Sequence, residues 1–380
     1  MKTKSTRTVK IGGFAHVGAV TLGGGLPVVI QTMWKERLFP ADLEGEAGIL
    51  KRIENLGSMG CGLLRFAVPD LVSAEVLGRL AGMVSMPLVA DIHFDYKIAL
   101  RCLDFPIAKI RINPGNIGGR EKIACVLEKA GGKGIPIRIG VNSGSLPQDL
   151  RLHSQSPAPY SPAEALVSAA ERELAIFDEF GFKDVLVSMK ASSVADTIRA
   201  NRMFAERSDV PLHIGVTEAG PLIAGVVRNT AALVSLLGDG IGDTIRVSLS
   251  DTMEREVIAG REILEAANEI AGFGNGSSGV RIISCPRCGR SGFDTHGFTE
   301  RWQNRFYAMK KNISVAIMGC EVNGPGEAAN ADIGITGAGN KVLIFRKGKV
   351  IRSVDTSELV SAAELASAAD TAFEEELGKL

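Results

Sequence analysis

The sequence predicts an α/β protein that consists of a (β/α)8 TIM barrel followed by a smaller C-terminal α/β domain. Short apolar runs of strand type recur eight times in the first two-thirds of the chain, at residues 28–33, 63–68, 88–92, 108–113, 136–141, 184–189, 212–217 and 244–249. Segments with helical periodicity lie between them, for example at residues 41–59, 73–84, 120–131, 163–180, 193–208 and 224–237. Apolar strands that alternate with helices are typical of a parallel sheet covered on both faces, and eight such units match a closed barrel. A doubly wound open sheet is the alternative, but no Gly-x-Gly-x-x-Gly motif follows a strand, as that fold would favour.

A Gly- and Ser-rich stretch separates the two predicted domains. It covers residues 271–279, with the sequence AGFGNGSSG, and this composition is typical of a linker. We therefore expect a barrel domain at residues 1–270 and a second domain at residues 280–380. The second domain contains strand-like runs at residues 313–318 and 341–345 and ends in an acidic, helical tail at residues 357–380.

The overall composition is that of an ordinary globular protein. Of 380 residues, 45% are apolar, and 43 Lys and Arg balance 43 Asp and Glu. A net charge of zero argues against a surface built for nucleic acid or for an anionic membrane, so any anion site must be local. No secretory signal is visible after the basic start, and no apolar run is long enough to span a bilayer. We expect a cytoplasmic protein.

Six cysteines in a chain of this size do not indicate a disulfide framework. Cys61, Cys102 and Cys125 lie among apolar neighbours, and we expect them to be buried as small hydrophobic residues. Cysteines that are not paired in disulfides fit a protein in a reducing compartment.

The remaining cysteines form the most informative motif of the chain. Cys285-Pro-Arg-Cys288 is followed by Cys320 in a second segment. Two thiolates at this spacing can hold one metal centre from a single turn, and a third can approach it from elsewhere. Zinc and iron–sulfur sites usually have four ligands, and Glu327, which follows Cys320 across a Gly-Pro-Gly turn, is well placed to supply the fourth. The spacing leaves zinc and iron–sulfur chemistry both open, and three unliganded thiols are the remaining interpretation.

Four of the predicted barrel strands carry an Arg in the middle of an apolar run, namely Arg65, Arg111, Arg138 and Arg246. A guanidinium is costly to bury unless it is paired, so four of them in one barrel require counter-charges. Asp91 and Glu218 at strand ends can supply some of these. A polyanionic ligand best supplies the rest, because Arg matches phosphate oxygens bidentately, and Lys190 would add a fifth positive charge. The alternatives are a structural lattice of ion pairs, or Arg side chains that point outward between the helices.

Polar residues follow the predicted strands, at the end of the barrel where such enzymes carry their chemistry. Asn, Ser and Gly groups there are suited to a diphosphate or to polyol hydroxyls. His93 alone could be a structural histidine, but its neighbours Asp91 and Asp95 favour a role in substrate binding. The candidate residues at these strand ends are Asp91, His93, Asn113, Asn142, Ser188, Lys190 and Glu218.

Six motifs together resemble those of the 4-hydroxy-3-methylbut-2-en-1-yl diphosphate synthase family of the non-mevalonate isoprenoid pathway. They are ADIHFDY at 90–96, RINPGN at 111–116, PIRIGVN at 136–142, TEAG at 217–220, CPRC at 285–288 and GCEVNGPGEA at 319–328. The match runs in order from about residue 8 to about residue 350. Its spacing is similar to that of the two-domain bacterial members, with no room for the extra central domain of plant-type members.

The resemblance implies a reaction, a cofactor and an electron donor. Members of the family convert 2-C-methyl-D-erythritol 2,4-cyclodiphosphate into (E)-4-hydroxy-3-methylbut-2-enyl diphosphate by a two-electron reductive ring opening with loss of water. Their [4Fe–4S] cluster is held by three Cys and one Glu, so the smaller domain would be an iron–sulfur domain. Electrons arrive from flavodoxin or ferredoxin. In this sequence the implied cluster ligands are Cys285, Cys288, Cys320 and Glu327.

The resemblance also implies roles for the barrel residues and an assembly. The diphosphate would lie on Arg65, Arg111, Arg138 and Lys190, with Arg246 also expected to bind substrate. The rest of the pocket would be lined by Asp91, His93, Asn113, Asn142, Ser188 and Glu218, and we expect catalytic roles for Glu218 and Glu327. In the family the cluster domain of one subunit caps the barrel of its partner, so a homodimer is implied.

One segment departs from the family pattern. After the first barrel strand the family usually has Met-Thr-Asn-Thr, whereas this chain has Met33-Trp34-Lys35-Glu36-Arg37. Larger and charged side chains there change the volume and the charge near the substrate. The departure keeps a second hypothesis open, namely a divergent relative that binds a phosphorylated ligand, with a structural or regulatory cluster and altered or weak activity.

Overall fold

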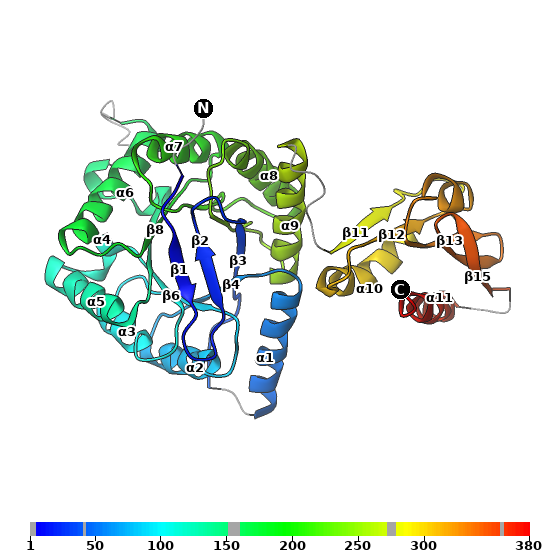
Figure 1. Cartoon of the computed structure of the whole chain (residues 1–380), viewed down its shortest axis with the longest axis horizontal. Coiled ribbons are helices and arrows are strands. Elements are labelled where there is room, and N and C mark those ends of the chain that lie inside the picture. The colour runs from blue at the N-terminus through cyan, green and yellow to red at the C-terminus, as the bar shows by residue number, and fades with distance from the viewer. Residues whose placement is uncertain (1–4, 41–42, 151–159, 272–278, 358–360) are drawn as a thin grey trace. The chain divides into compact units, whose positions relative to one another are not determined.

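Figure 1 shows the chain, which a computed structural model describes over residues 5–40, 43–150, 160–271, 279–357 and 361–380. The chain divides into two compact units, Met1–Gly276 and Ser277–Leu380. Most of the predicted linker, residues 272–278, lies outside the described ranges. Within those ranges, no helix is both long and apolar enough to cross a membrane.

Eight parallel strands form the sheet at the centre of the first unit, and helices surround them (Figure 1). A parallel bridge between Val187 and Leu212 brings together the two ends of the strand order, so the sheet curls into a barrel. The predicted barrel fold is confirmed. In sheet order the strands are β8 (Val185–Lys190), β7 (Ile137–Asn142), β6 (Lys109–Ile112), β5 (Leu88–Asp91), β4 (Leu63–Ala67), β3 (Val29–Met33), β10 (Thr244–Ile245) and β9 (His213–Ile214).

Strands β9 and β10 are shorter than the apolar runs at 212–217 and 244–249 suggested, since each contains two residues. Gly215 ends β9 with a φ of +156°, in the region that favours glycine. A Cβ at this position would lie 2.3 Å from the carbonyl oxygen of Arg246. The chain therefore leaves the sheet here, and the rest of each run belongs to the loops at the barrel mouth.

The helices of the first unit follow the strands in order. In α5 the residues Ile123, Val126, Leu127 and Ala130 are buried, which is the spacing of one helical face. Cys125 lies on the opposite face and is exposed, so the expectation that it is buried was wrong. The helices are α1 (Leu43–Ser58), α2 (Leu71–Ala81), α3 (Tyr96–Cys102), α4 (Pro114–Ile117), α5 (Arg120–Lys133), α6 (Pro162–Glu179), α7 (Val194–Arg207), α8 (Leu222–Gly238) and α9 (Met253–Ile270).

An antiparallel hairpin, β1 (Val9–Gly12) and β2 (Ala19–Leu22), lies across one end of the barrel (Figure 1). Its apolar residues Ile11 and Leu22 share a buried cluster with Leu63 and Ala108, which lie at or just before the amino-terminal ends of β4 and β6. The hairpin thus covers the amino-terminal end of the barrel with apolar contacts. The carboxyl-terminal end carries the polar residues.

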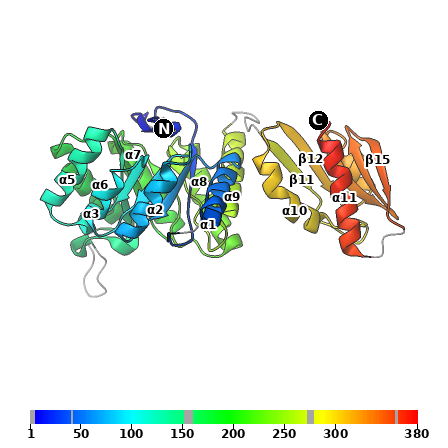
Figure 2. The same ribbon diagram turned by 90° about the horizontal axis from the view of Figure 1, so that it is seen from below.

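A five-stranded sheet forms the centre of the second unit, in the order β11 (Val280–Ser284), β12 (Ile313–Met318), β13 (Ile333–Ala338), β14 (Lys341–Arg346) and β15 (Lys349–Asp355). The first three strands are parallel, and the last two are antiparallel to their neighbours. The predicted strands at 313–318 and 341–345 are confirmed. The helices α10 (Thr295–Ala308) and α11 (Ala362–Leu377) lie together on one face of this sheet (Figure 2).

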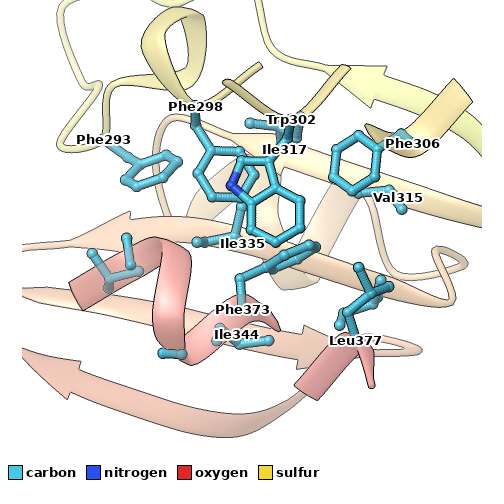
Figure 3. Packing of buried hydrophobic residues seen from close by; sticks show 14 of the residues in the cluster. Phe293, Phe298, Trp302, Phe306, Val315, Ile317, Ile335, Ile344, Phe373 and Leu377 are labelled. Carbon is cyan, nitrogen blue, oxygen red and sulfur yellow. The ribbon is translucent and has the colours of Figure 1, made fainter. Parts of the chain in front are cut away.

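Aromatic side chains hold these two helices on the sheet (Figure 3). Phe298, Trp302 and Phe306 follow one another along one face of α10, and Phe373 of α11 lies edge-on to the first two, with ring centroids 5.2 Å apart in both cases. Edge-to-face and stacked aromatic contacts add to the stabilisation from burial. Phe373 is fully buried and provides the main apolar contact between the two helices. Asp370 also joins them, by accepting hydrogen bonds from Arg301 and Trp302.

We expect Phe373→Ala to lower the free energy of unfolding of the second unit by about 3–5 kcal/mol, because it leaves a cavity among the aromatic rings. The measurement is denaturant unfolding followed by Trp302 fluorescence in a Trp34→Phe background, where Trp302 is the one remaining Trp. The control is Val350→Ala, since Val350 is 49% exposed and should change little. Equal stability of the two variants would contradict a structural role for the aromatic cluster.

Candidate functional site

A cavity of about 160 Å³ lies at the carboxyl-terminal ends of the barrel strands. Most of its lining comes from residues at or next to the ends of different strands, which is the usual arrangement of a TIM-barrel site. The lining residues are Met33, Arg65, Asp91, His93, Arg111, Arg138, Asn142, Ser188, Lys190, Thr217, Arg246 and Ser248.

Strand alternation places the Arg side chains in this cavity. In β4, Leu64 and Phe66 are fully buried on either side of Arg65. Successive side chains of a strand point to opposite faces, so these apolar neighbours pack toward the helices while Arg65 points into the barrel. Arg111 and Arg138 stand between buried Ile residues in the same way. These Arg side chains therefore do not point outward between the helices, which was the alternative interpretation of the sequence.

Asp91 is the carboxylate of the cavity lining, and three side chains converge on it. Its oxygens lie 3.1 Å from Nη1 of Arg111, 3.6 Å from Nε of Arg65 and 3.4 Å from Nε2 of His93. Burial alone would raise the pKa of the Asp91 carboxyl, but Arg65, His93 and Arg111 outweigh it and hold this pKa well below its usual range. Asp91 is thus an ionised anchor that fixes the positions of two guanidinium groups.

Gly140 fixes the position of the Arg111 side chain. The Gly140 carbonyl accepts a hydrogen bond of 3.1 Å from Nη2 of Arg111, and a Cβ at position 140 would lie 2.2 Å from Nε of the same side chain. Any larger residue there would displace the guanidinium. The Gly in the motif at 136–142 is therefore explained by the close approach of Arg111.

Arg138 and Lys190 form no ion pair with a carboxylate in the part of the chain that the structure describes. Nη1 of Arg138 donates to Oγ of Ser188 at 3.0 Å, but within the described part of the chain its buried Nε and Nη2 have no hydrogen-bond partner. Burial, together with the neighbouring cations, lowers the pKa of both Arg138 and Lys190 well below their ordinary values. Two buried donors without acceptors are costly, so this part of the cavity favours an anionic ligand.

Glu256 of α9 is a second buried carboxylate at the edge of the cavity, and it was not among the residues predicted from the sequence. Its oxygens lie 3.2 and 3.3 Å from Nη2 and Nε of Arg246. They also accept hydrogen bonds from Oγ1 of Thr32, at 2.6 Å, and from Nζ of Lys35, at 2.5 Å. Burial raises the pKa of Glu256, but Arg246, Lys35 and Thr32 outweigh it and lower this pKa overall.

The cavity brings together most of the predicted barrel residues but not all of them. Asn113 and Glu218 are not among the lining residues. Asn113 is buried directly before the short helix α4, where its carbonyl accepts the first backbone hydrogen bonds, and Glu218 has a φ of +52°, a conformation that redirects the chain after Thr217. Met33, Thr217 and Ser248 line the cavity and were not predicted, although each lies at or soon after the end of a barrel strand, and that position could have pointed to them.

The three cysteines of the second unit lie on neighbouring segments. Cys285 directly follows β11, Cys320 follows the adjacent parallel strand β12, and the N–H of Gly292 donates to the carbonyl of Gly319 at 2.7 Å. All three are free thiols, and hydrogen bonds from the Asn323 and Val322 backbone and from Arg290 lower the pKa of Cys320. Among the described residues, no three His, Cys, Asp or Glu side chains converge closely enough to hold a metal ion. The side chain of Glu327 lies outside the described part of the structure.

Comparisons with known proteins cover both units. The family described as "GcpE TIM-barrel domain" matches residues 12–261, and "GcpE protein C-terminal domain" matches residues 281–368. The 4-hydroxy-3-methylbut-2-en-1-yl diphosphate synthase (flavodoxin) of Treponema pallidum is 52% identical over 98% of this chain and 92% of its own length. The protein of the same name from Treponema denticola is 51% identical over 99% of both chains. Among solved structures, a dihydropteroate synthase of Thermus thermophilus covers 70% of this chain and 99% of its own, with 14% identity and a TM-score of 0.48, a likeness too weak to carry a functional argument.

The fold and the cavity define a two-domain TIM-barrel protein with a strongly cationic cavity at the barrel mouth. Both family descriptions match in order and together span most of the sequence. The chain belongs to the GcpE family.

Glu173 of α6 lies beside Gly115 in α4. Its Oε1 would be 3.0 Å from a Cβ at Gly115, and its Oε2 is buried without a hydrogen-bond partner among the described residues. Burial raises the pKa of Glu173 to about 7, although a hydrogen bond from the Gly115 backbone opposes this.

We expect the stability of the protein to fall as pH rises from about 5 to 8 because of Glu173. In the unfolded chain its pKa is about 4.3, so at pH 5 the unfolded state has already released most of this proton, whereas the folded state keeps it until the pH approaches about 7. Unfolding therefore releases a proton between these two values, and stability falls as the pH rises through them. Glu173→Gln should therefore gain stability relative to the wild type at pH 8 compared with pH 5, as measured by denaturant unfolding. Glu171→Gln is the control on the same helix, because the Glu171 side chain is 41% exposed. An identical pH dependence in all three proteins would contradict the assignment.

Proposed function

We propose that this protein is a flavodoxin-dependent 4-hydroxy-3-methylbut-2-en-1-yl diphosphate synthase. It would convert 2-C-methyl-D-erythritol 2,4-cyclodiphosphate to (E)-4-hydroxy-3-methylbut-2-enyl diphosphate, an oxidoreductase reaction of isoprenoid biosynthesis. Its curated relatives carry the synthase name over nearly the whole length of this chain. We propose flavodoxin as the electron donor because the name of these relatives includes it. Ferredoxin is the other donor expected from the resemblance.

The cationic cavity is the observation that carries the proposal. Five cationic side chains line it, against the single carboxylate of Asp91: Arg65, Arg111, Arg138, Lys190 and Arg246. Buried charges of one sign repel one another, and burial lowers the pKa of Arg65 to about 10. A doubly phosphorylated ligand supplies the missing negative charge and accepts the hydrogen bonds that Arg138 lacks.

The cofactor we propose is a [4Fe–4S] cluster held by Cys285, Cys288, Cys320 and Glu327. The residues fit such a group, because three free thiols follow the ends of two adjacent parallel strands and the pKa of Cys320 is lowered by backbone hydrogen bonds. The cluster would accept single electrons from the donor protein and deliver them to the bound substrate. Three soft thiolates with one exchangeable carboxylate suit iron better than a closed structural zinc site.

The barrel residues bind the substrate and handle its charge. In the balanced reaction, the substrate takes up two electrons and two protons, the ring carbon–oxygen bond breaks, and one hydroxyl leaves as water. Arg111, oriented by Asp91 and the Gly140 carbonyl, would bind one phosphate, and Arg138 with Lys190 would hold the negative charge that ring opening releases. The roles of His93, Asn142 and Ser188 in the cavity, and of Asn113 at its border, are to bind the rest of the substrate.

We assign proton delivery to Glu218. It follows Thr217, which lines the cavity, and a carboxyl beside the departing hydroxyl can give it the proton with which it leaves as water. Glu327 is the second residue to which we assign a catalytic role, as the ligand that gives way to substrate.

The divergent, weakly active relative is a poorer explanation of the cavity. None of the residues at 34–37 is among the lining residues, so the segment that departs from the family pattern does not fill the site. Met33, just before it, contributes to the lining instead.

The synthase would act as a cytoplasmic homodimer. The cationic side chains proposed to bind the substrate lie in the first unit, and the thiols proposed to hold the cluster lie in the second. A complete active site therefore needs both units. The resemblance assigns the two halves of each site to different subunits.

The test of the function is turnover of the cyclic diphosphate by protein prepared without oxygen, with reduced methyl viologen as an artificial donor. We expect formation of the linear diphosphate product and close to four iron and four sulfide per chain, as a [4Fe–4S] cluster requires. Protein that holds stoichiometric zinc without sulfide and does not turn over would contradict both the function and the cofactor.

Arg138→Ala should raise the KM for the cyclic diphosphate by about 10- to 150-fold, since a charge-assisted hydrogen bond contributes roughly 1.5–3 kcal/mol. The chain should still fold, because the change removes a buried guanidinium with two unsatisfied donors. Arg79→Ala is the control, because Arg79 is half exposed and does not line the cavity. An unchanged KM in Arg138→Ala would mean that this residue does not contact the substrate.

Mixing two impaired subunits, assayed at a substrate concentration far below the raised KM of Arg138→Ala, tests the assembly. Cys320→Ala lacks a proposed cluster ligand and Arg138→Ala lacks a proposed substrate ligand, so a heterodimer with sites shared between subunits has one complete site. We expect recovery of up to about half of the activity per heterodimer, measured after purification with two different affinity tags. Inactive heterodimers would indicate that each site is built within one chain.

A further inference from the structure

The β3–α1 loop that departs from the family pattern is tied to the barrel by specific contacts. Trp34 stacks on Phe66 of β4 with ring centroids 5.3 Å apart, and the Arg52 guanidinium lies 5.2 Å from the Trp34 ring centroid. Arg52 also pairs with Glu36 at 2.7 Å. These contacts hold the residue between them, Lys35, in one position.

Lys35 is directed at the buried carboxylate of Glu256. Its Nζ lies 2.5 Å from Oε1 of Glu256 and donates to the Leu249 carbonyl at 3.0 Å. Glu256 is 1% exposed, and it also pairs with Arg246, which lines the cavity. One carboxylate thus serves two cations, of which only Arg246 reaches the cavity.

The net charge of the three side chains Lys35, Glu256 and Arg246 depends on Lys35. Arg246 and Glu256 alone form a neutral pair, and a guanidinium whose charge is already balanced attracts an anion weakly. With Lys35 present, the three side chains carry a net charge of +1, and the free side of Arg246 faces the cavity. Lys35 itself does not line the cavity, so any effect on the ligand has to pass through Glu256.

We propose that Lys35 is a positioning residue for anion binding: it neutralises Glu256, so that Arg246 keeps its positive charge available to the diphosphate. This inference rests on the proposed function of the cavity. It assigns to the altered loop a contribution to substrate affinity rather than a loss of activity.

The test measures binding of inorganic diphosphate to the full-length protein by titration calorimetry at low and high salt. Lys35→Met should weaken binding about tenfold at low salt, the size expected for one charge near the site, and should weaken its salt dependence. Lys35→Arg should bind as the wild type does. Arg37→Met is the matched control, since it removes the same charge from the same loop but pairs with Asp70, which does not line the cavity.

A double variant separates the charge effect from a structural one. In Lys35→Met/Glu256→Gln the carboxylate charge is gone as well, so Arg246 again carries a net charge of +1, and binding should recover most of the lost affinity. A purely structural role of Lys35 predicts instead that the double variant binds no better than Lys35→Met. Lys35→Gln replaces Lys35→Met if the latter does not fold.

Two results would overturn the inference: unchanged binding in Lys35→Met, or no recovery in the double variant. If the wild type itself binds no inorganic diphosphate, the proposed anion site fails and the inference fails with it. If the wild type binds diphosphate and Lys35→Met binds equally well, only the inference fails.

Discussion

The repulsion among cations inside the barrel is the constraint on which the site depends. Arg65, Arg111, Arg138 and Lys190 share one small cavity, and burial deprives each of them of the water that would screen its charge. Such a group persists only because the surrounding barrel is held by apolar contacts that do not involve it, from the helices around the sheet and the hairpin across its amino-terminal end. The barrel thus bears an electrostatic cost that an anionic ligand can relieve.

Two carboxylates divide the cations into groups with different tasks. Asp91 fixes Arg65 and Arg111, and Glu256 fixes Arg246, so these three guanidinium groups have set directions before a ligand arrives. Arg138 and Lys190 have no carboxylate partner among the described residues. Orientation and unbalanced charge are therefore supplied by different side chains, which is the pre-organisation that binding of a multiply charged ligand needs.

The sequence was sufficient for the barrel and for the cationic cavity because both depend on local patterns. An Arg between two Ile in a strand can only face away from them, so Arg111 and Arg138 were predictable without tertiary information. Glu256 was not, because α9 carries several acidic residues and helical periodicity does not tell which of them meets a barrel strand. Asn113 and Glu218 follow their strands as expected, yet neither lines the cavity, since the helix α4 begins directly after Asn113 and Glu218 has a positive φ. Such backbone detail does not follow from residue type.

The candidate site of the second unit consists of thiols rather than of buried charges. Its aromatic core lies on one face of the sheet, between α10 and α11, whereas Cys285 and Cys320 follow the carboxyl ends of β11 and β12. The aromatic packing between the helices is thus separate from these segments. A second buried cluster, which includes Met318, Ala328 and Phe345, packs against Cys285, so the segments proposed to hold the cluster also rest on apolar contacts. In the barrel, by contrast, most of the residues that line the cavity belong to the strands themselves. Under the proposed function the two units divide the work: the charged cavity of the barrel binds the diphosphate, and the thiol-bearing segments of the second unit serve the electrons.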